Sequence, residues 1–320
     1  SKRLGIPSTI VMPKGTPFTK ISRTKAFGAR VLLHGENVNT AEPFAKELAD
    51  SESLTLVHPY DDELIINGQG TIALEMLADV GDLDIIAVPI GGGGIIAGIA
   101  TAAKEISPKI ELIGIEAAQY PSMYEILHKL KPTSGGNTIA EGIAIKKPGY
   151  STRKVVERLV DDIILVSEFA LESAILTMLE SDKILTEGAG AAPLAALIEN
   201  PTRFVGKKIG LVICGGNIDA RLLASVLMRG LVRTDRIVRL RVTITDRPGA
   251  LAAVAQKIAM VGGDIIEIAH QRLFQDVPIK LADLDVLVET RDKIQTDEII
   301  DELNKGGLPT RQLGISETGP

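Results

Sequence analysis

The sequence predicts an α/β protein in which a largely parallel sheet covered by helices is followed by a smaller α/β domain. Two observations carry this prediction. Short apolar runs alternate with helical segments over roughly the first 230 residues, which is typical of parallel strand–helix repeats. After Arg236 the pattern changes, and residues 238–244 alternate apolar and polar side chains, as a half-buried antiparallel strand does.

Composition narrows the class of protein. At 320 residues the chain is long enough for two domains. A net charge of −6 gives no support to nucleic-acid binding, which would need a basic face, and no apolar run is long enough to span a bilayer. The single cysteine, Cys214, excludes a disulfide framework within the chain. Without a signal-like N-terminus, we expect a cytoplasmic protein that binds neither nucleic acid nor membrane.

The first part of the chain begins with SKRLG, which reads as the tail of a helix, so we expect that the natural N-terminus has been lost. Helices are predicted between most of the strands, for example over residues 18–28 and 171–182. The predicted strands are residues 8–12, 29–33, 54–58, 84–90, 110–116, 162–167 and 209–214.

The second part of the chain predicts the order βαββαβ, a complete ferredoxin-like domain. Its helix 296–307 has Thr296 as the expected N-cap. The other elements are a strand at 238–244, a turn and helix within 246–263, strands within 264–273 and 283–290, and a strand at 308–315. We place the first domain at residues 1–230, a linker at 231–237 and the second domain at 238–320.

A run of glycines connects a predicted buried strand (85–90) to a predicted helix (95–106). Main-chain N–H groups at such a helix start attract an anion, and the absence of Cβ atoms lets the anion approach closely. The glycines are Gly91, Gly92, Gly93 and Gly94. A bound phosphate is the leading interpretation, and a tight turn whose glycines only relieve crowding is the alternative.

The same turn also fits a dinucleotide fingerprint. Gly92, Gly94 and Ala97 match G-x-G-x-x-A, and Glu116 ends the next strand at about the distance of a ribose-binding carboxylate. An NAD-binding protein is therefore a competing interpretation. The two surplus glycines and the distance from the first strand disfavour it.

Three other stretches contain candidate site residues. Cys214 is the last residue of a predicted strand and Gly215 follows it, at the carboxyl end where α/β sheets bind ligands, although a lone cysteine is more often inert core. Glu187 precedes a run of small residues, which suits either a helix start close to a ligand or a favourable contact with the helix dipole. Gly142 lies in a small-residue loop that is uninformative alone.

The histidines predict no metal site. His58 precedes Asp61 and Asp62, a pattern that suits acid–base chemistry but more commonly marks a strand end and a polar turn. The remaining histidines lack metal-ligand spacing; they are His34, His128 and His270.

Taken in order, the motifs MPKGTPFTKISRTKAFGA, VHPYDD, NGQGTIALE, VPIGGGGIIAG, IEAAQYPSMY, TIAEGIA, LTEGAGAA and VICGGNID resemble those of the threonine ammonia-lyases. These are fold-type II pyridoxal phosphate enzymes, and the resemblance covers nearly all of residues 1–236. The last 84 residues, DRPGALAAVAQKIAMVGGDI above all, resemble an ACT regulatory domain. The pairing is that of the medium-length enzyme with one C-terminal ACT domain.

The resemblance implies a cofactor, pyridoxal 5′-phosphate, and β-elimination of ammonia from threonine or serine to give 2-oxobutanoate or pyruvate. The four glycines 91–94 would hold the cofactor phosphate, and Cys214 would face the pyridine nitrogen, with Gly215 leaving room beside it. Gly142 and Glu187 would line the ring and the substrate, and Asn217 would support the turn after Cys214.

The sequence departs from the family in one respect. The family's Schiff-base lysine lies in a Ser-Phe-Lys-x-Arg-Gly-like segment and its substrate loop is Ser-x-Gly-Asn-His-like, and these 320 residues contain neither. Lys25 and Lys183 are expected to be surface charges. We therefore predict no catalytic residue in this chain and no elimination by the chain alone; a non-catalytic regulatory or partner-binding chain is the alternative. Related enzymes hold a metal near a position that is Ser122 here, so no metal is predicted.

The ACT resemblance places an amino-acid site at the turn that leads into the first helix of the second domain. The residues concerned are Asp246, Pro248, Gly249 and Ala250. A branched-chain effector such as isoleucine or valine, bound within a homo-oligomer, is the expectation. Dimerisation without an effector is the alternative.

Overall fold

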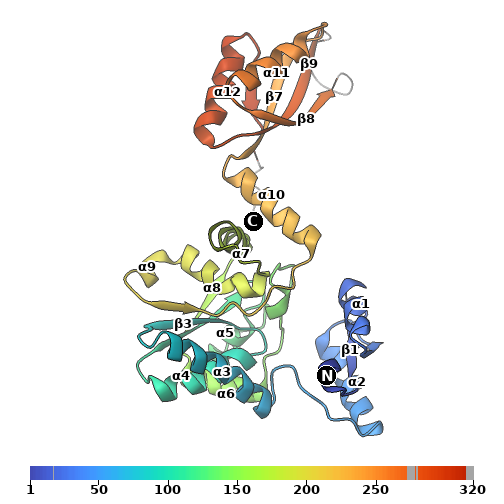
Figure 1. Cartoon of the computed structure of the whole chain (residues 1–320), viewed down its shortest axis with the longest axis vertical. Coiled ribbons are helices and arrows are strands. Elements are labelled where there is room, and N and C mark those ends of the chain that lie inside the picture. Colours follow the sequence, from blue (N-terminus) through green and yellow to red (C-terminus); the bar gives the residue numbers. More distant parts are fainter. Residues whose placement is uncertain (17, 272–277, 279, 315–320) are drawn as a thin grey trace. The chain divides into compact units, whose positions relative to one another are not determined.

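The computed structural model describes residues 1–16, 18–271, 278 and 280–314. Contacts divide the chain into two compact units. One comprises Ser1–Leu171 and Gly188–Gly215, and the other comprises Glu172–Glu187 and Gly216–Pro320. Figure 1 shows their helices and strands and labels many of them.

The first unit is built on a parallel four-stranded sheet of order β5-β4-β3-β6, as the strand–helix alternation predicts. All five residues of β3 are buried, because helices lie on both faces, with α8 on one and α3, α4 and α6 on the other (Figure 1). The strands are β3 (Ile85–Pro89), β4 (Glu111–Ala117), β5 (Asp162–Val166) and β6 (Ile209–Leu211). The main helices are α3 (Glu63–Asp79), α4 (Gly94–Ile106), α5 (Ser122–Leu127), α6 (Tyr150–Leu159), α8 (Gly188–Glu199) and α9 (Pro201–Phe204).

The start of the chain forms a separate parallel pair, β1 (Thr9–Met12) with β2 (Arg30–Leu33). Helix α1 (Phe18–Ala26) connects them, and α2 (Val38–Ser51) follows. The expected helix tail is a 3₁₀ turn, Lys2–Leu4, which ends at Gly5 with φ 64°.

Two sequence predictions in this unit are wrong. Residues 54–58 form no strand, because no described strand pairs with them and Leu54, Leu56 and Val57 remain exposed. Strand β6 ends at Leu211 rather than at residue 214. The predicted helix 171–182 exists as α7 (Glu168–Thr177), continued by a π-helical turn, Met178–Asp182.

Helices α3 and α4 approach closely through glycines. A Cβ atom on Gly98 would lie 2.2 Å from the carbonyl oxygen of Ile66, and one on Gly70 would lie 3.1 Å from the carbonyl oxygen of Gly98. The absence of side chains at these two positions lets the helices pack backbone to backbone. This contact fixes α4, which begins at the glycine turn.

The second unit contains α10 (Ala220–Arg233) and an antiparallel sheet of order β10-β7-β9-β8. This arrangement confirms the predicted βαββαβ order. Buried residues of α11 and α12 pack on the apolar face of β7, which alternates as the sequence suggests. The elements are β7 (Ile237–Thr245), α11 (Ala250–Met260), β8 (Asp264–Gln271), β9 (Leu281–Glu289), α12 (Lys293–Lys305) and β10 (Thr310–Gln312).

The predicted N-cap of α12 is wrong. Asp292 caps this helix by accepting from the Gln295 N–H, and Thr296 lies buried inside the first turn. An aspartate at the earlier position satisfies the first N–H groups equally well, so the helix extends back to it. The predicted linker, 231–237, covers the end of α10 and the first residue of β7. Residues 272, 273 and 315, which belong to two of the predicted strands, lie outside the described residues.

No helix in the described ranges combines the length and the apolar character needed to cross a membrane.

The contact between α3 and α4 can be tested with matched glycine substitutions. Gly98→Ala should lower the free energy of unfolding by about 2 kcal/mol, because the new methyl group meets a backbone oxygen that cannot move away cheaply. Gly68→Ala, at an exposed position of α3 with open space around it, should raise the free energy by up to about 1 kcal/mol through helix propensity. Urea unfolding followed by circular dichroism measures both, and equal effects would contradict the packing argument.

Candidate active site

The glycine turn lies at the carboxyl end of β3, where the chain enters α4. Gly93 has φ 93°, a left-handed conformation that glycine adopts without strain, and it forms the N-cap of the 13-residue helix. Among the described residues, no acceptor contacts the N–H groups of Gly92, Gly93 and Gly94. The turn therefore presents main-chain donors at the positive end of a helix, an arrangement suited to binding an anion.

Crowding also explains the glycines. A Cβ atom would lie 2.2 Å from the Tyr60 ring at Gly92 and 2.8 Å from the Thr152 hydroxyl at Gly93. At Gly91 and Gly94 it would lie 3.0 Å from neighbouring main-chain atoms. The two interpretations of the turn are therefore compatible, since its sides are filled by protein while its N–H groups lack acceptors.

Two further predicted site residues lie on the same edge of the sheet as the turn. The carbonyl oxygen of Gly142 is 3.3 Å from the Cβ position of Gly91, which places the 3₁₀ turn Glu141–Ile143 beside the glycines. Cys214 follows β6, the strand that pairs in parallel with β3, and it is exposed. The alternative of an inert buried cysteine is therefore wrong.

The cofactor contacts of all these residues stay predictions, as do those of three more. Gly215 is the last residue of the first unit, and Glu187 and Asn217 belong to the second unit. Glu187 directly precedes α8, whose first residue is packed so tightly that a Cβ on Gly188 would lie 2.5 Å from the Ile139 carbonyl oxygen. The small residues at the start of α8 are thus packed against the protein's own main chain, and the predicted contact with a ligand stays a prediction.

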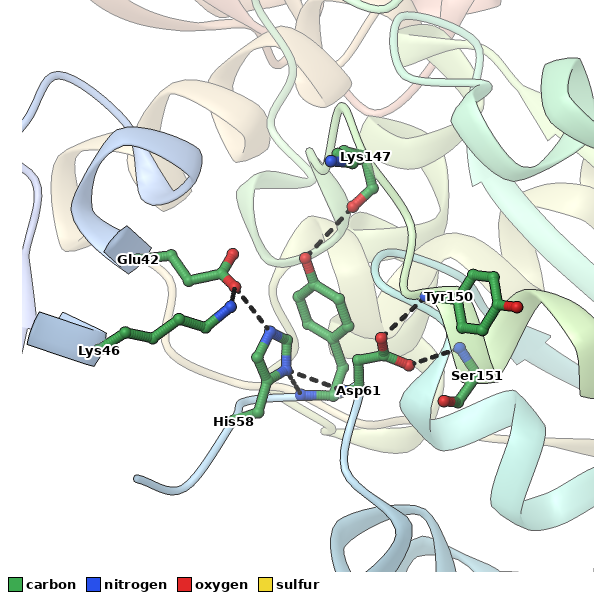
Figure 2. Close-up of polar contacts among 8 residues, drawn as sticks. Glu42, Lys46, His58, Asp61, Lys147, Tyr150 and Ser151 are labelled. Carbon is green, nitrogen blue, oxygen red and sulfur yellow. Dashed lines mark hydrogen bonds and ion pairs between the residues drawn. The ribbon is translucent and has the colours of Figure 1, made fainter. Parts of the chain in front are cut away.

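The polar turn predicted around His58 is confirmed (Figure 2). The His58 Nδ1 accepts from the N–H groups of Tyr60 and Asp61, at 3.2 and 2.8 Å, and Nε2 lies 3.8 Å from a Glu42 oxygen. The Tyr60 hydroxyl donates to the Lys147 carbonyl oxygen at 3.2 Å. Burial, with the carboxylates of Glu42 and Asp61, raises the pKa of Tyr60 above its usual range.

Sequence analysis missed that this polar turn packs on the glycine turn. Tyr60 covers Gly92 and Gly94, and Asp61 binds the start of α6, which in turn contacts Gly92. The VHPYDD motif was the available signal. Nothing in the sequence, however, pairs it with a helix about 90 residues away.

Glu116 serves a structural purpose that removes it from a nucleotide site. It is fully buried, and its two oxygens accept from the N–H groups of Met123 and Tyr124 at 2.8 and 2.9 Å. Burial raises the pKa of Glu116 to about 7, against the opposing effect of these hydrogen bonds. A carboxylate held in this way does not reach a ribose, so the dinucleotide interpretation loses its acidic residue.

Ser122, for which no metal role is predicted, bonds within the protein. Ser122 is buried and donates to the Ile145 carbonyl oxygen at 2.6 Å. No group of three or more His, Cys, Asp or Glu side chains suited to a metal ion occurs in the part of the chain that the structure describes.

In the second unit, the predicted regulatory residues occupy the junction of β7 and α11. The Asp246 N–H donates to the Lys280 carbonyl oxygen at 3.0 Å. Gly249, with φ 88°, caps α11 at Ala250, directly after Pro248. The turn has the predicted geometry, and its regulatory role stays a prediction.

Comparison with known proteins identifies the family. Residues 1–215 match the family described as pyridoxal-phosphate dependent enzyme. The chain belongs to the pyridoxal-phosphate dependent enzymes. It is 42% identical to an L-threonine ammonia-lyase of Geobacter sulfurreducens over 306 residues, covering 95% of this chain and 76% of the relative. It is 38% identical to an L-threonine ammonia-lyase of Thermotoga maritima over 312 residues, covering 97% and 78%. The crystal structure of a threonine deaminase from T.th. is 34% identical with a TM-score of 0.63, covering 68% of this chain and 71% of that one.

The residues present fit the cofactor of this pyridoxal-phosphate dependent family. The turn offers main-chain donors without acceptors to a phosphate, and the Cys214 end of β6 lies on the next strand of the same sheet. Both features lie at the carboxyl ends of parallel strands, where α/β sheets bind ligands.

The buried Glu116 predicts a pH-dependent stability. Its pKa of about 7 in the folded chain exceeds the ordinary value of 4.5, so the folded state binds the proton more tightly than the unfolded state. This contribution, roughly 3 kcal/mol, is complete below about pH 4.5 and is lost as the pH rises through about 7. Glu116→Gln mimics the protonated form, so it should flatten the fall in the free energy of unfolding between these values.

Urea unfolding at several pH values measures the effect. The exposed Glu75 of α3 provides the control, and Glu75→Gln should keep the wild-type profile. Parallel profiles for Glu116→Gln and the wild-type chain would contradict the assignment.

Proposed function

We propose that this chain carries the cofactor-binding and C-terminal parts of a threonine ammonia-lyase, which releases ammonia from L-threonine to give 2-oxobutanoate. L-serine would give pyruvate in the same way. Two relatives with this name match nearly the whole chain. The glycine turn, with donors lacking acceptors at the start of α4, is the single observation that carries the proposal.

The chain's own residues would bind and orient the cofactor. The N–H groups of the glycine turn would hold its phosphate, and Gly142 would close one side of the turn. Cys214 would meet the pyridine nitrogen as a neutral partner, which leaves that nitrogen less firmly protonated than a carboxylate would. Gly215, Glu187 and Asn217 complete the proposed set. When bound, the cofactor withdraws the electrons that remain at the substrate α-carbon after its proton is removed.

Removal of that proton needs a base, and the proposed site residues of this chain supply none. The lysine segment of the family is not among these 320 residues. The Lys183 ammonium donates to the Glu180 carbonyl oxygen at 2.7 Å, within its own turn, and Lys25 is exposed on α1. These 320 residues are therefore expected to bind the cofactor without performing elimination.

Binding and catalysis can be measured separately on the same sample. In equilibrium dialysis, the chain should bind pyridoxine 5′-phosphate, lose it in competition with inorganic phosphate, and show no affinity for NAD. Supplied with pyridoxal phosphate and L-threonine, it should release no 2-oxobutanoate above a blank. Affinity for NAD alone would overturn the cofactor assignment, and 2-oxobutanoate release would show that the chain holds a base.

We also infer that the second domain is an ACT regulatory module for a branched-chain amino acid. Its βαββαβ sheet of order β10-β7-β9-β8 supports this assignment. A left-handed glycine at the start of α11 adds to it, since no side chain caps this helix and the Ala250 N–H donates to the Arg247 carbonyl oxygen at 3.3 Å. The similarity to the Geobacter relative covers 95% of the chain and therefore extends into this domain.

Calorimetric titration tests this module with two matched glycines. Isoleucine or valine should give a heat of binding that Gly249→Ala abolishes, since φ 88° strains any side chain there. Gly262 has φ 81° and lies just past the opposite end of α11, so Gly262→Ala introduces a similar strain away from the turn and should keep the heat. No heat with any branched-chain amino acid would favour a module that only dimerises. Sedimentation of the same samples measures the homo-oligomer, which stays a prediction.

A further inference from the structure

The starts of α4 and α6 lie side by side in the first unit. At the start of α6, a carboxylate of the chain itself binds the main-chain N–H groups. The Asp61 carboxylate accepts from the N–H groups of Tyr150, Ser151 and Thr152, at 2.8, 2.9 and 3.2 Å. These are the first three residues of α6. Figure 2 shows the carboxylate facing Tyr150 and Ser151. A residue about 90 positions upstream thus performs the capping that the helix's own N-cap, Gly149, does not provide.

The start of α6 in turn holds the glycine turn. The Thr152 hydroxyl donates to the Gly92 carbonyl oxygen at 2.7 Å, and the Gly149 N–H donates to the same oxygen at 3.1 Å. In a planar trans peptide the carbonyl and the following N–H point in opposite directions. Holding the Gly92 carbonyl against α6 therefore aims the Gly93 N–H away from α6.

The contacts around Asp61 leave it little freedom. His58 accepts from the Asp61 N–H at 2.8 Å. The Tyr60 ring packs on Gly92, where a Cβ atom would lie 2.2 Å from it. A Cβ on Gly149 would lie 2.6 Å from the Asp61 carboxyl carbon. The carboxylate, α6 and the turn consequently form one tightly packed group.

We propose that Asp61 is a positioning residue for the cofactor phosphate, acting through Thr152 and the Gly92 carbonyl. This inference rests on the proposed function of the glycine turn. Asp61 keeps α6 in the place from which Thr152 fixes the peptide between Gly92 and Gly93. It also occupies the positive end of α6, so that the start of α4 is the one that accepts an external anion.

The sign of the effect separates this role from simple electrostatics. A carboxylate near a phosphate repels it, so removal of that charge alone would strengthen phosphate binding. A positioning role predicts the opposite, because misaligned N–H donors lose hydrogen bonds to a charged group. Asp61→Ala should therefore weaken phosphate binding although it removes a negative charge.

The test measures dissociation constants of pyridoxine 5′-phosphate and of pyridoxine by equilibrium dialysis with the full chain. Asp61→Ala should weaken binding of the phosphate ester about tenfold or more and should change pyridoxine binding little. Asp62→Ala is the matched control. This neighbouring aspartate caps α3 by accepting from the Leu64 and Ile65 N–H groups, so these hydrogen bonds stay within the start of its own helix. Asp62→Ala should remove the cap of α3 but keep the wild-type ratio of the affinities for pyridoxine 5′-phosphate and pyridoxine.

Thr152 provides a second pair of variants that leaves Asp61 in place. Thr152→Val keeps the shape of this buried side chain but removes the donor to Gly92, so it should reproduce the loss of phosphate affinity. Thr152→Ser restores the hydroxyl and should recover wild-type binding to within about twofold. This pair keeps the test valid if Asp61→Ala fails to fold.

The outcomes distinguish the two proposals. If the wild-type chain binds no pyridoxine 5′-phosphate, the proposed function of the turn is wrong and this inference falls with it. If the wild-type chain binds it, and Asp61→Ala and Thr152→Val bind equally well or better, the positioning role alone is overturned. A loss in Asp62→Ala as large as in Asp61→Ala would reduce the effect to general destabilisation and would also overturn it.

Discussion

The close packing around the glycine turn is the constraint on which the rest of the first unit depends. Tyr60, Thr152 and the 3₁₀ turn Glu141–Ile143 come from three distant parts of the sequence and fill the space that side chains at positions 91–94 would occupy. Because protein interiors tolerate little change in volume, each of these neighbours restricts the others. The turn is thereby held in one conformation, in which the N–H groups of Gly92, Gly93 and Gly94 have no acceptor among the described residues.

Main-chain N–H groups at several helix starts of the described chain are satisfied by carboxylates. Asp62, Asp219 and Asp292 do this as local N-caps, while Asp61 and Glu116 reach across to α6 and α5. A helix start without a carboxylate partner differs from these. In the described part of the first unit, the long helix α4 begins at glycines instead of a capping side chain, and this is the helix end at which the family's cofactor is proposed to bind.

The segment 172–187 is connected by its contacts to the second unit. Residues 172–187 belong by their contacts to the unit that contains the βαββαβ sheet. The buried Glu172 forms ion pairs with Arg229 and Arg233 of α10, at 2.9 and 2.6 Å, and Arg236 pairs with Glu180 at 2.8 Å. The segment that ends at Glu187 is therefore tied to the helix that leads into the proposed regulatory domain. Only the pair of Glu172 with Arg233 is well shielded from solvent, so removal of Arg233 would leave a poorly compensated buried charge, while the exposed pair of Arg236 with Glu180 contributes little.

The sequence by itself determined the features that depend on local pattern. Apolar runs of strand length predicted β3, β4 and β5, alternation predicted β7, and the glycines at Gly91 to Gly94 predicted the turn between strand and helix. Only the tertiary structure decided which elements had partners. Residues 54–58 have the composition of a strand but no strand beside them, and β6 stops at Leu211. Likewise Thr296 and Asp292 are both capable N-caps, and packing of α12 selected Asp292. The contact of Asp61 with α6 and Gly92 joins three segments through hydrogen bonds that carry no sequence periodicity. Such contacts form only when folding brings distant segments together. Local patterns in the sequence therefore predict the individual elements and turns, but they do not predict which of these meet to form the site.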